Sequence, residues 1–178
     1  MPRFSLHAIG RDQPGIVASV AGVLAEIGCN LADSRMTVLN GQFAIMLIVD
    51  SNAVDDGAVI ERALADTAKQ FELLISVRPI QSDAGKSDIV SSIAVSIHGS
   101  DHPGIVAQIA DVIAKHTGNI VDLETRVIEQ DEVATYVMLL TVGLPASTPL
   151  EGLIQALRVE AERIGVVCVV SPIDTGLL

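Results

Sequence analysis

Gly10-Arg-Asp-Gln-Pro-Gly-Ile-Val-Ala18 is followed further along the chain by Gly99-Ser-Asp-His-Pro-Gly-Ile-Val-Ala107. Seven of the nine positions are identical, and the two stretches are offset by 99 − 10 = 89 residues. The same offset, continued without a gap, pairs Asn30 with Asn119. A repeat of this kind indicates two copies of one structural unit.

Each copy shows the same order of predicted elements: strand, helix, strand, strand, helix, strand. In the first copy Phe4, Leu6 and Ala8 alternate with polar residues, as in a strand with one buried face. The dipeptide Asn40-Gly41 predicts a hairpin turn. The pattern βαββαβ, present twice, predicts an α+β protein with two ferredoxin-like domains, each a four-stranded antiparallel sheet with both helices on one face.

The domain boundaries follow from the repeat. Residues 1–80 form the first domain, the polar segment 81–88 is a linker, and residues 89–178 form the second domain. In the first copy, apolar spacing predicts a helix from Pro14 to Ile27 and a second helix with Ile60, Leu64, Ala68 and Phe71 on one side. Right-handed crossovers place the first and third strands in the middle of each sheet, so the loop after the first strand leaves a central strand.

The loop between the first strand and the first helix carries groups that suit a small zwitterion. Peptide N–H groups of Gly15, Ile16 and Val17 are expected to point outward from a helix N-terminus, where they attract an anion. Asp12 precedes this helix, and its carboxylate can accept hydrogen bonds from an ammonium group. Asn30, where the second strand begins, offers both a donor and an acceptor. These groups together fit a free α-amino acid.

Both copies supply the same set of candidate ligand-binding positions. They are Gly10, Asp12, Gln13, Gly15, Ile16 and Asn30 in the first copy, and Gly99, Asp101, His102, Gly104, Ile105 and Asn119 in the second. Two structural interpretations stand beside this one: the aspartates can cap their helices, and the asparagines can be turn residues after a helix exit. Because both residues occur together in each copy, we favour an amino-acid site of micromolar to millimolar affinity.

The first helix of the first copy is apolar nearly all round, because Glu26 is its only charged residue. Such a helix either packs on a second surface, from the other copy or another subunit, or exposes small alanine and serine side chains to water.

Composition argues against several classes of partner. Lys plus Arg number 11 against 22 Asp plus Glu, and the resulting net charge of −11 opposes direct nucleic-acid binding. The longest apolar run, Phe43 to Val49, is far shorter than the roughly 20 residues that cross a membrane, so no membrane role is indicated. Cys29 and Cys168 form neither a disulfide framework nor a metal motif, which favours a cytoplasmic protein.

The chain also lacks the patterns of common enzyme classes. Its four histidines and two cysteines do not have metal-ligand spacing, and it has no nucleophile elbow or phosphate-binding loop. His102 beside Asp101 is the best catalytic pair available, but neighbouring loop residues of this kind more often cap a helix. We therefore expect no catalytic residue, no metal and no cofactor.

The segments Gly10 to Val17, Gly28 to Arg35 and Phe43 to Leu47 resemble the ACT domain, a small regulatory module that binds amino acids. The resemblance covers nearly the whole chain as a tandem pair. The first segment is common to many ACT domains. The other two, in a stand-alone double-ACT chain, resemble a group of transcriptional repressors within the family.

The resemblance implies that an amino acid, often glycine or serine, binds where two ACT domains meet, and that the units form homo-oligomers through edge strands. In serine-regulated members the ligand is held by the loop after strand one and by an Asn that opens strand two. The matching positions here are Gly10, Asp12 and Asn30, with Gly99, Asp101 and Asn119 in the second copy. Those members carry His at the position of Gly10 and Asn at that of Asp12, so the amino acid bound here is left open.

The resemblance further implies regulation without catalysis. The repressors of this group act through a protein partner, a DNA-bound activator, which agrees with the acidic charge of the chain. Two alternatives remain: an in-trans regulatory subunit of an amino-acid metabolic enzyme, and a structural ACT pair that has lost ligand binding.

Overall fold

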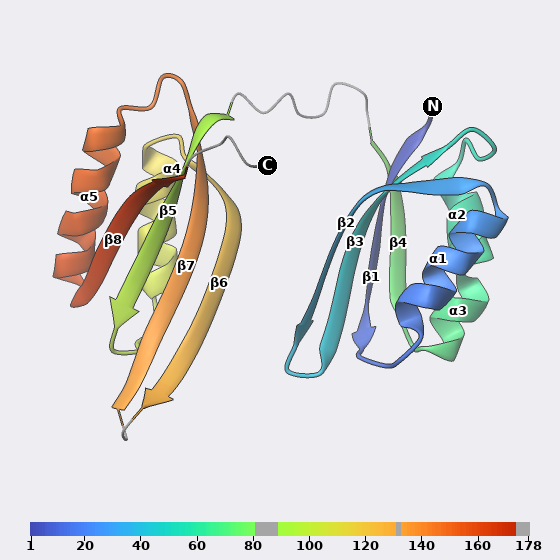
Figure 1. The fold of residues 1–178 in the computed structure, drawn as a ribbon, viewed down its shortest axis with the longest axis horizontal. Coiled ribbons are helices and arrows are strands. Elements are labelled where there is room, and N and C mark those ends of the chain that lie inside the picture. Colours follow the sequence, from blue (N-terminus) through green and yellow to red (C-terminus); the bar gives the residue numbers. More distant parts are fainter. Residues whose placement is uncertain (81–88, 131–132, 174–178) are drawn as a thin grey trace. The chain divides into compact units, whose positions relative to one another are not determined.

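The computed structural model describes residues 1–80, 89–130 and 133–173. The chain separates into two compact units, Met1–Gly85 and Lys86–Leu178, which we call unit 1 and unit 2 (Figure 1). The segment predicted as a linker, 81–88, lies outside the described residues.

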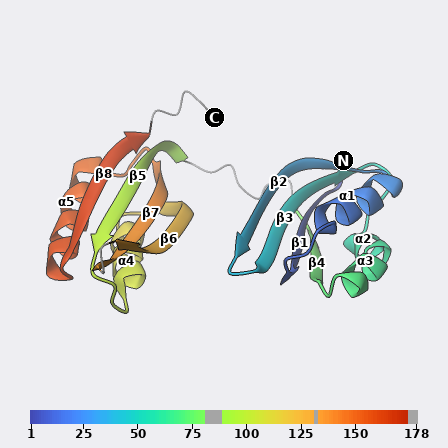
Figure 2. The same cartoon turned by 60° about the horizontal axis from the view of Figure 1, so that its bottom comes forward.

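Unit 1 is a four-stranded antiparallel sheet in the order β2-β3-β1-β4, with its helices on one face (Figure 2). Its elements are β1 (Arg3–Arg11), α1 (Ile16–Glu26), β2 (Cys29–Leu39), β3 (Gln42–Ser51), α2 (Gly57–Ala63), α3 (Ala65–Gln70) and β4 (Leu74–Pro79). The first and third strands are central, as predicted.

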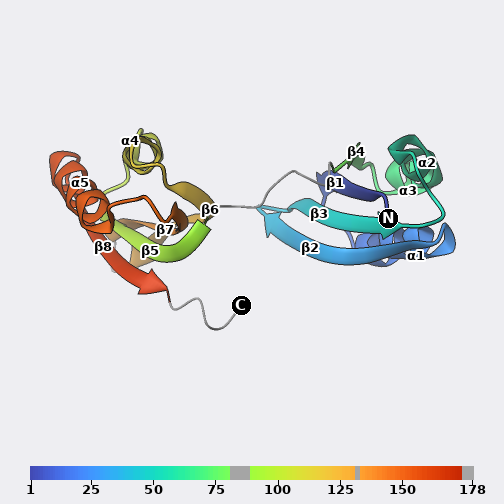
Figure 3. The same ribbon diagram turned by 90° about the horizontal axis from the view of Figure 1, so that it is seen from above.

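Unit 2 repeats this architecture in the order β6-β7-β5-β8, and Figure 3 shows both of its helices on one side of the sheet. Its elements are β5 (Ile89–Gly99), α4 (Ile105–Lys115), β6 (Asn119–Gln130), β7 (Val133–Pro145), α5 (Leu150–Arg163) and β8 (Val166–Ile173). The predicted fold, two ferredoxin-like α+β domains, is therefore confirmed.

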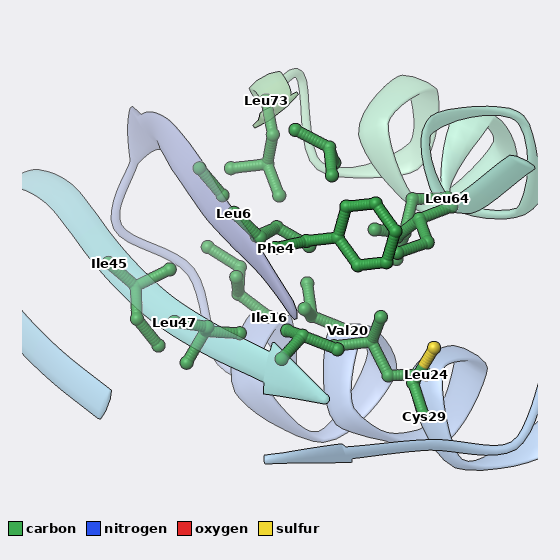
Figure 4. Close-up of a cluster of buried hydrophobic side chains, with 14 of the residues drawn as sticks. Phe4, Leu6, Ile16, Val20, Leu24, Cys29, Ile45, Leu47, Leu64 and Leu73 are labelled. Atoms are coloured by element: carbon green, nitrogen blue, oxygen red, sulfur yellow. The ribbon is translucent and has the colours of Figure 1, made fainter. Parts of the chain in front are cut away.

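The core of unit 1 lies between the sheet and the helices. The side chains of Phe4, Leu6 and Ala8 are all at most 1% exposed, which confirms the alternation predicted for β1. Figure 4 shows the side chains that α1 contributes at helical spacing, Ile16, Val20 and Leu24. Burial of each large apolar side chain contributes about 1.5–3 kcal/mol.

Helix α1 begins later than predicted. Gly15 has a φ of 97°, so Pro14 lies before the helix rather than in its first turn. The outward surface of α1 exposes Val17, at 47%, together with small residues such as Ala18 and Gly22. Contact with a second surface and exposure of a small-residue surface both stay predictions.

Where the sequence predicts one second helix in unit 1, the structure has two short helices, α2 and α3. Leu64, with φ −85° and ψ −1°, separates α2 from α3. Backbone bonds from Leu64 N to Ile60 O (3.1 Å) and from Ala68 N to Leu64 O (2.8 Å) span the junction. The hydroxyls of Thr67 and Ser19 lie 3.0 Å apart and join α3 to α1, a tertiary contact that apolar spacing does not reveal.

The β2–β3 hairpin turns at Asn40 and Gly41, as predicted. Both residues have positive φ, 50° and 76°, and the flanking residues Leu39 and Gln42 are paired. These are the dihedral signs of a two-residue turn that matches the twist of the strands.

Among the described residues, no helix is both long and apolar enough to cross a membrane.

Candidate functional site

The first strand of each unit has a glycine at or next to its last residue, and neither glycine has room for a side chain. A Cβ on Gly10 would lie 2.8 Å from Leu73 Cδ2 and 3.1 Å from the carbonyl oxygen of Glu72. A Cβ on Gly99 would lie 2.8 Å from Val166 Cγ1. Residues at or just before the start of the last strand therefore leave no room for a Cβ, and the two glycines can offer a ligand only backbone atoms.

The helix that follows each loop begins at a left-handed glycine without a capping side chain. Gly15 and Gly104 have φ values of 97° and 101°, a region that glycine adopts without strain. No side-chain cap bonds to α1 or α4 among the described residues, so the interpretation of Asp12 and Asp101 as caps was wrong. Both carboxylates are exposed beside the positive ends of these helices.

Ile16 and Ile105, the first residues of these helices, are only 1% and 2% exposed. Their side chains lie in the two cores, so each can contribute only its peptide N–H to a ligand. This N–H belongs to the first helical turn, where amides have no partner within the helix.

Gln13 and His102 occupy equivalent positions and make equivalent contacts within their units. Gln13 Nε2 donates to the carbonyl oxygen of Phe71 (3.2 Å), and His102 Nε2 lies 2.9 Å from the carbonyl oxygen of Ile164. Phe71 and Ile164 are the C-cap residues of α3 and α5. Because a carbonyl only accepts, Nε2 of His102 carries the proton in this contact. These two side chains position the loops.

A backbone hydrogen bond joins the loop of unit 1 to the hairpin. The N–H of Asp12 donates to the carbonyl oxygen of Gly41 at 2.9 Å. The β1–α1 loop and the end of edge strand β2 therefore lie at the same end of the sheet.

Asn30 and Asn119 lie at the opposite end of their sheets. Asn30 is paired with Asp50, which is paired in turn with Arg3 at the start of β1. Helix α1, of 11 residues, runs between the loop and Asn30 and spans about 16 Å at 1.5 Å per residue. Asn119 opens β6 and is paired with Gly143. Neither unit brings its asparagine to its own loop, and both asparagines are strand residues, so the turn interpretation was wrong.

An ion pair lies beside Asn30. Arg3 Nε donates to Asp50 Oδ1 at 2.7 Å, and this hydrogen bond holds the pKa of the Asp50 carboxyl below its ordinary value. Asp50 therefore stays ionised in mildly acidic solution.

A small apolar cavity of about 20 Å³ lies between α1 and the sheet of unit 1. Its lining residues are Ile16, Val17, Val20 and Ala21 from α1, Leu31 from β2, and Phe43, Ile45 and Leu47 from β3. A space of this size holds about one water molecule, and an apolar lining keeps such a space dry.

Tyr136 is the polar residue near the loops that the sequence reasoning missed. It is paired with Gly99, as Phe43 is paired with Gly10, and is 8% exposed. Burial raises the pKa of its phenol, and the negative charge of Asp101 raises it further. The offset of 89 residues aligns Phe43 with position 132 rather than 136. Only the register of the longer second hairpin reveals the equivalence.

Among the described residues, no three His, Cys, Asp or Glu side chains gather as a metal site requires.

The ACT domain matches residues 4–78 and 91–171. The glycine cleavage system transcriptional repressor of Escherichia coli (strain K12) is 26% identical over 157 residues, which cover 86% of this chain and 80% of the relative.

Two solved structures cover nearly the whole chain. A protein of unknown function from Galdieria sulphuraria aligns with a TM-score of 0.85 and 28% identity over 97% of this chain and 99% of its own. A protein provisionally called a glycine cleavage system transcriptional repressor aligns with a TM-score of 0.74 and 15% identity over 98% of both chains. At that identity the second structure supports the fold alone.

Proposed function

Because the chain belongs to the ACT domain family and carries one ACT domain in each unit, we propose that it is a non-catalytic regulator that binds a free amino acid at its β1–α1 and β5–α4 loops. The observation that carries this proposal is the uncapped start of α1 and α4 beside an exposed aspartate. The ligand carboxylate accepts from the first-turn amides, and its ammonium donates to Asp12 or Asp101. Three such bonds, at about 1.5–3 kcal/mol each, offset several kcal/mol of association cost and leave a modest affinity.

An ACT unit from a second copy of the chain completes each site in this proposal. Asn30 is the second residue of the edge strand β2, and the hairpin that ends β2 is bonded to the ligand loop through Gly41. When two such edge strands pair antiparallel, the start of one lies beside the end of the other. The asparagine of one unit then reaches the loop of its neighbour, which it cannot do within its own unit.

The edge strands have the surface that such pairing needs. From Asn30 to Leu39 every residue of β2 is exposed, and so is every residue of β6 from 121 to 129. Met36 is 51% exposed and Val127 is 49% exposed. A long edge strand with apolar side chains is a template for pairing with another chain, and we propose a homo-oligomer on this ground.

We place the regulated step in transcription and the protein in the cytoplasm. The Escherichia coli relative is a transcriptional repressor of the glycine cleavage system, which favours glycine or serine as the ligand. The net charge of −11 favours a protein partner, such as a DNA-bound activator, over direct contact with DNA. The free thiols of Cys29 and Cys168 suit a reducing compartment.

Regulation requires that the ligand favour one arrangement of the paired units over another. The bond from Asp12 to Gly41 links the ligand loop to the end of the pairing strand. Binding at the loop therefore changes the stability of the paired arrangement, and with it the affinity for the partner.

Isothermal titration calorimetry with a panel of free amino acids, starting with glycine and serine, tests the proposal. We expect Asp12→Ala and Asp101→Ala each to weaken binding at its own unit at least tenfold, the equivalent of about 1.4 kcal/mol. Asp55→Ala, which removes an exposed carboxylate before α2, is the matched control and should bind as the wild type does.

Absence of heat with every amino acid would favour the structural ACT pair. Binding that survives both aspartate substitutions would place the ligand elsewhere. Capture of a metabolic enzyme instead of a transcription factor would favour an in-trans regulatory subunit.

A further inference from the structure

The two loop sites differ at the strand residue beneath the helix start. In unit 1 this residue is Phe43, opposite Gly10, and in unit 2 it is Tyr136, opposite Gly99. Both side chains lie in the cores, at 2% and 8% exposed. The difference is one hydroxyl group at equivalent positions.

In unit 1 the wall beside the ligand loop is apolar. Phe43 lines the 20 Å³ cavity together with Ile16 and Val17, which begin α1. The register of strand pairs shows that Tyr136 is the counterpart of Phe43, and it packs in the same core as Ile105, the first residue of α4. Tyr136 therefore lies opposite Gly99, two residues before Asp101 in the loop that leads to α4.

The Tyr136 hydroxyl has no hydrogen-bond partner among the described residues, although nine-tenths of the residue is buried. Among the described residues, every fully buried polar side-chain atom has a hydrogen-bond partner. Because the Tyr136 hydroxyl has no partner, it is not fully buried and reaches solvent. It lies close enough to Asp101 for the carboxylate charge to raise the phenol pKa, after the larger effect of burial. A phenol has an ordinary pKa of about 10 and keeps its proton at neutral pH, so Tyr136 is a hydrogen-bond donor near Asp101.

An α-amino acid in this position has three groups to place. Its carboxylate faces the amides of Gly104 and Ile105, and its ammonium faces Asp101. The side chain is left to face the sheet, where Tyr136 stands in unit 2 and Phe43 stands in unit 1. This assignment rests on the proposed function.

We propose that Tyr136 makes the site of unit 2 selective for an amino acid with a small hydroxylated side chain, of the serine class, while the site of unit 1 prefers one with a hydrogen or a methyl group. The phenol O–H donates to the ligand hydroxyl. Phe43 offers no such donor, and its cavity has room for little more than a methyl group.

Tyr136→Phe and its counterpart Phe43→Tyr test this inference by calorimetry with serine, alanine and glycine. We expect Tyr136→Phe to weaken serine binding at unit 2 about tenfold and to change alanine and glycine binding less than about twofold. We expect Phe43→Tyr to strengthen serine binding at unit 1. Thermal unfolding of both variants checks that their folds are intact.

The wild-type protein offers an independent readout, because Tyr136 is the only tyrosine and there is no tryptophan. Its fluorescence therefore reports ligands at unit 2 alone. We expect serine to change this signal at lower concentration than alanine does, and Asp101→Ala to abolish the difference.

Equal loss of serine, alanine and glycine binding in Tyr136→Phe would overturn the selectivity and assign the phenol to the ligand carboxylate. Unchanged serine binding would remove Tyr136 from the site while the amino-acid sensor remained. If no amino acid binds the wild-type protein, the proposed function fails first and this inference fails with it.

Discussion

At the scale of single residues, Gln13 and His102 show that two different side chains can form the same stabilising contact. Each reaches across its unit to the carbonyl oxygen that ends the last helix. An amide and an imidazole each present one N–H at a suitable distance from the main chain. The loop is therefore held by the hydrogen bond rather than by a particular residue type.

This equivalence predicts the effect of changing His102. Alanine at this position removes the contact and leaves the carbonyl of Ile164 without this partner, which should lower the free energy of unfolding of unit 2 by about 1 kcal/mol. Glutamine should restore most of the loss, because Gln13 makes the same contact in unit 1.

Urea unfolding followed by the fluorescence of Tyr136 measures unit 2 selectively. Gln13→Ala, the matching change in unit 1, serves as the control and should leave that signal unchanged. A glutamine variant as unstable as the alanine variant would contradict this account of His102.

The residues of the candidate site were predictable from the sequence only in part. The shared motif identifies Asp12 and Gly15 because the loop is continuous in the chain. Asn30 was grouped with them, although the length of α1 places it at the other end of the sheet. Tyr136 was missed because the second hairpin is longer than the first. The constant offset of 89 residues therefore does not align Tyr136 with Phe43.

At the scale of elements, β2 and β6 differ from the opposite edge strands in the length of their exposed surface. β2 has 11 residues and β6 has 12, against 6 for β4 and 8 for β8. A long unpaired edge is a template for pairing with another chain, whereas a short one is a poor template.

Lysine on these edges should therefore reduce self-association. We expect the double variant Met36→Lys, Val127→Lys to sediment with a lower mass than the wild type, because lysines opposite each other across paired strands repel. Leu74→Lys places the same charge on the short edge strand β4, where Leu74 is 78% exposed, and should leave the mass unchanged.

Analytical ultracentrifugation over a range of protein concentrations measures this difference. If Leu74→Lys lowers the mass as much as the double variant does, pairing through β2 and β6 is wrong.

Local signals predicted the strands and the hairpin better than the second helix of unit 1. Alternation fixes the buried side of β1, and Asn40-Gly41 fixes the turn. The interruption at Leu64 follows no glycine or proline, and apolar residues continue through it at helical spacing. Contacts between helices, such as Ser19 with Thr67, are formed only after the chain has folded.

At the scale of the whole molecule, the two units share a fold but differ in their response to alkaline pH. Burial raises the pKa of the Cys168 thiol, and burial followed by the charge of Asp101 raises the pKa of Tyr136. Both groups belong to unit 2. In the folded unit they keep protons that the unfolded chain releases, so ionisation favours unfolding.

The contribution of these two groups to the free energy of unfolding of unit 2 should therefore be fully present below their ordinary pKa values, about 8.5 for Cys and about 10 for Tyr. It should be lost as the pH rises through the higher pKa values of the folded state. Thermal unfolding measured by circular dichroism between neutral and strongly alkaline pH tests this expectation. The double variant Tyr136→Phe, Cys168→Ala should lose less stability over that range than the wild type. Equal losses in the two proteins would contradict it.

The tandem architecture was the most predictable property of the chain, because an offset of 89 residues repeats the loop and helix that follow the first strand, and both units have the same strand order. How the protein associates with other chains could not be predicted in the same way. Association depends on exposed strand edges and surface charges. The repeat predicts that both units have such edges, but it does not identify the partner.

The left-handed glycines at the starts of α1 and α4 have no side chain that could accept a hydrogen bond from the N–H groups of the first turn. Most helices complete that end with a side chain of their own. Here the carboxylate of a bound ligand would supply the missing acceptor. Ligand binding and the ordering of the first helical turn would then be coupled. A cell rich in the metabolite would then hold a stiffer protein than a starved one, and slower amide exchange in the first turns would be its signature.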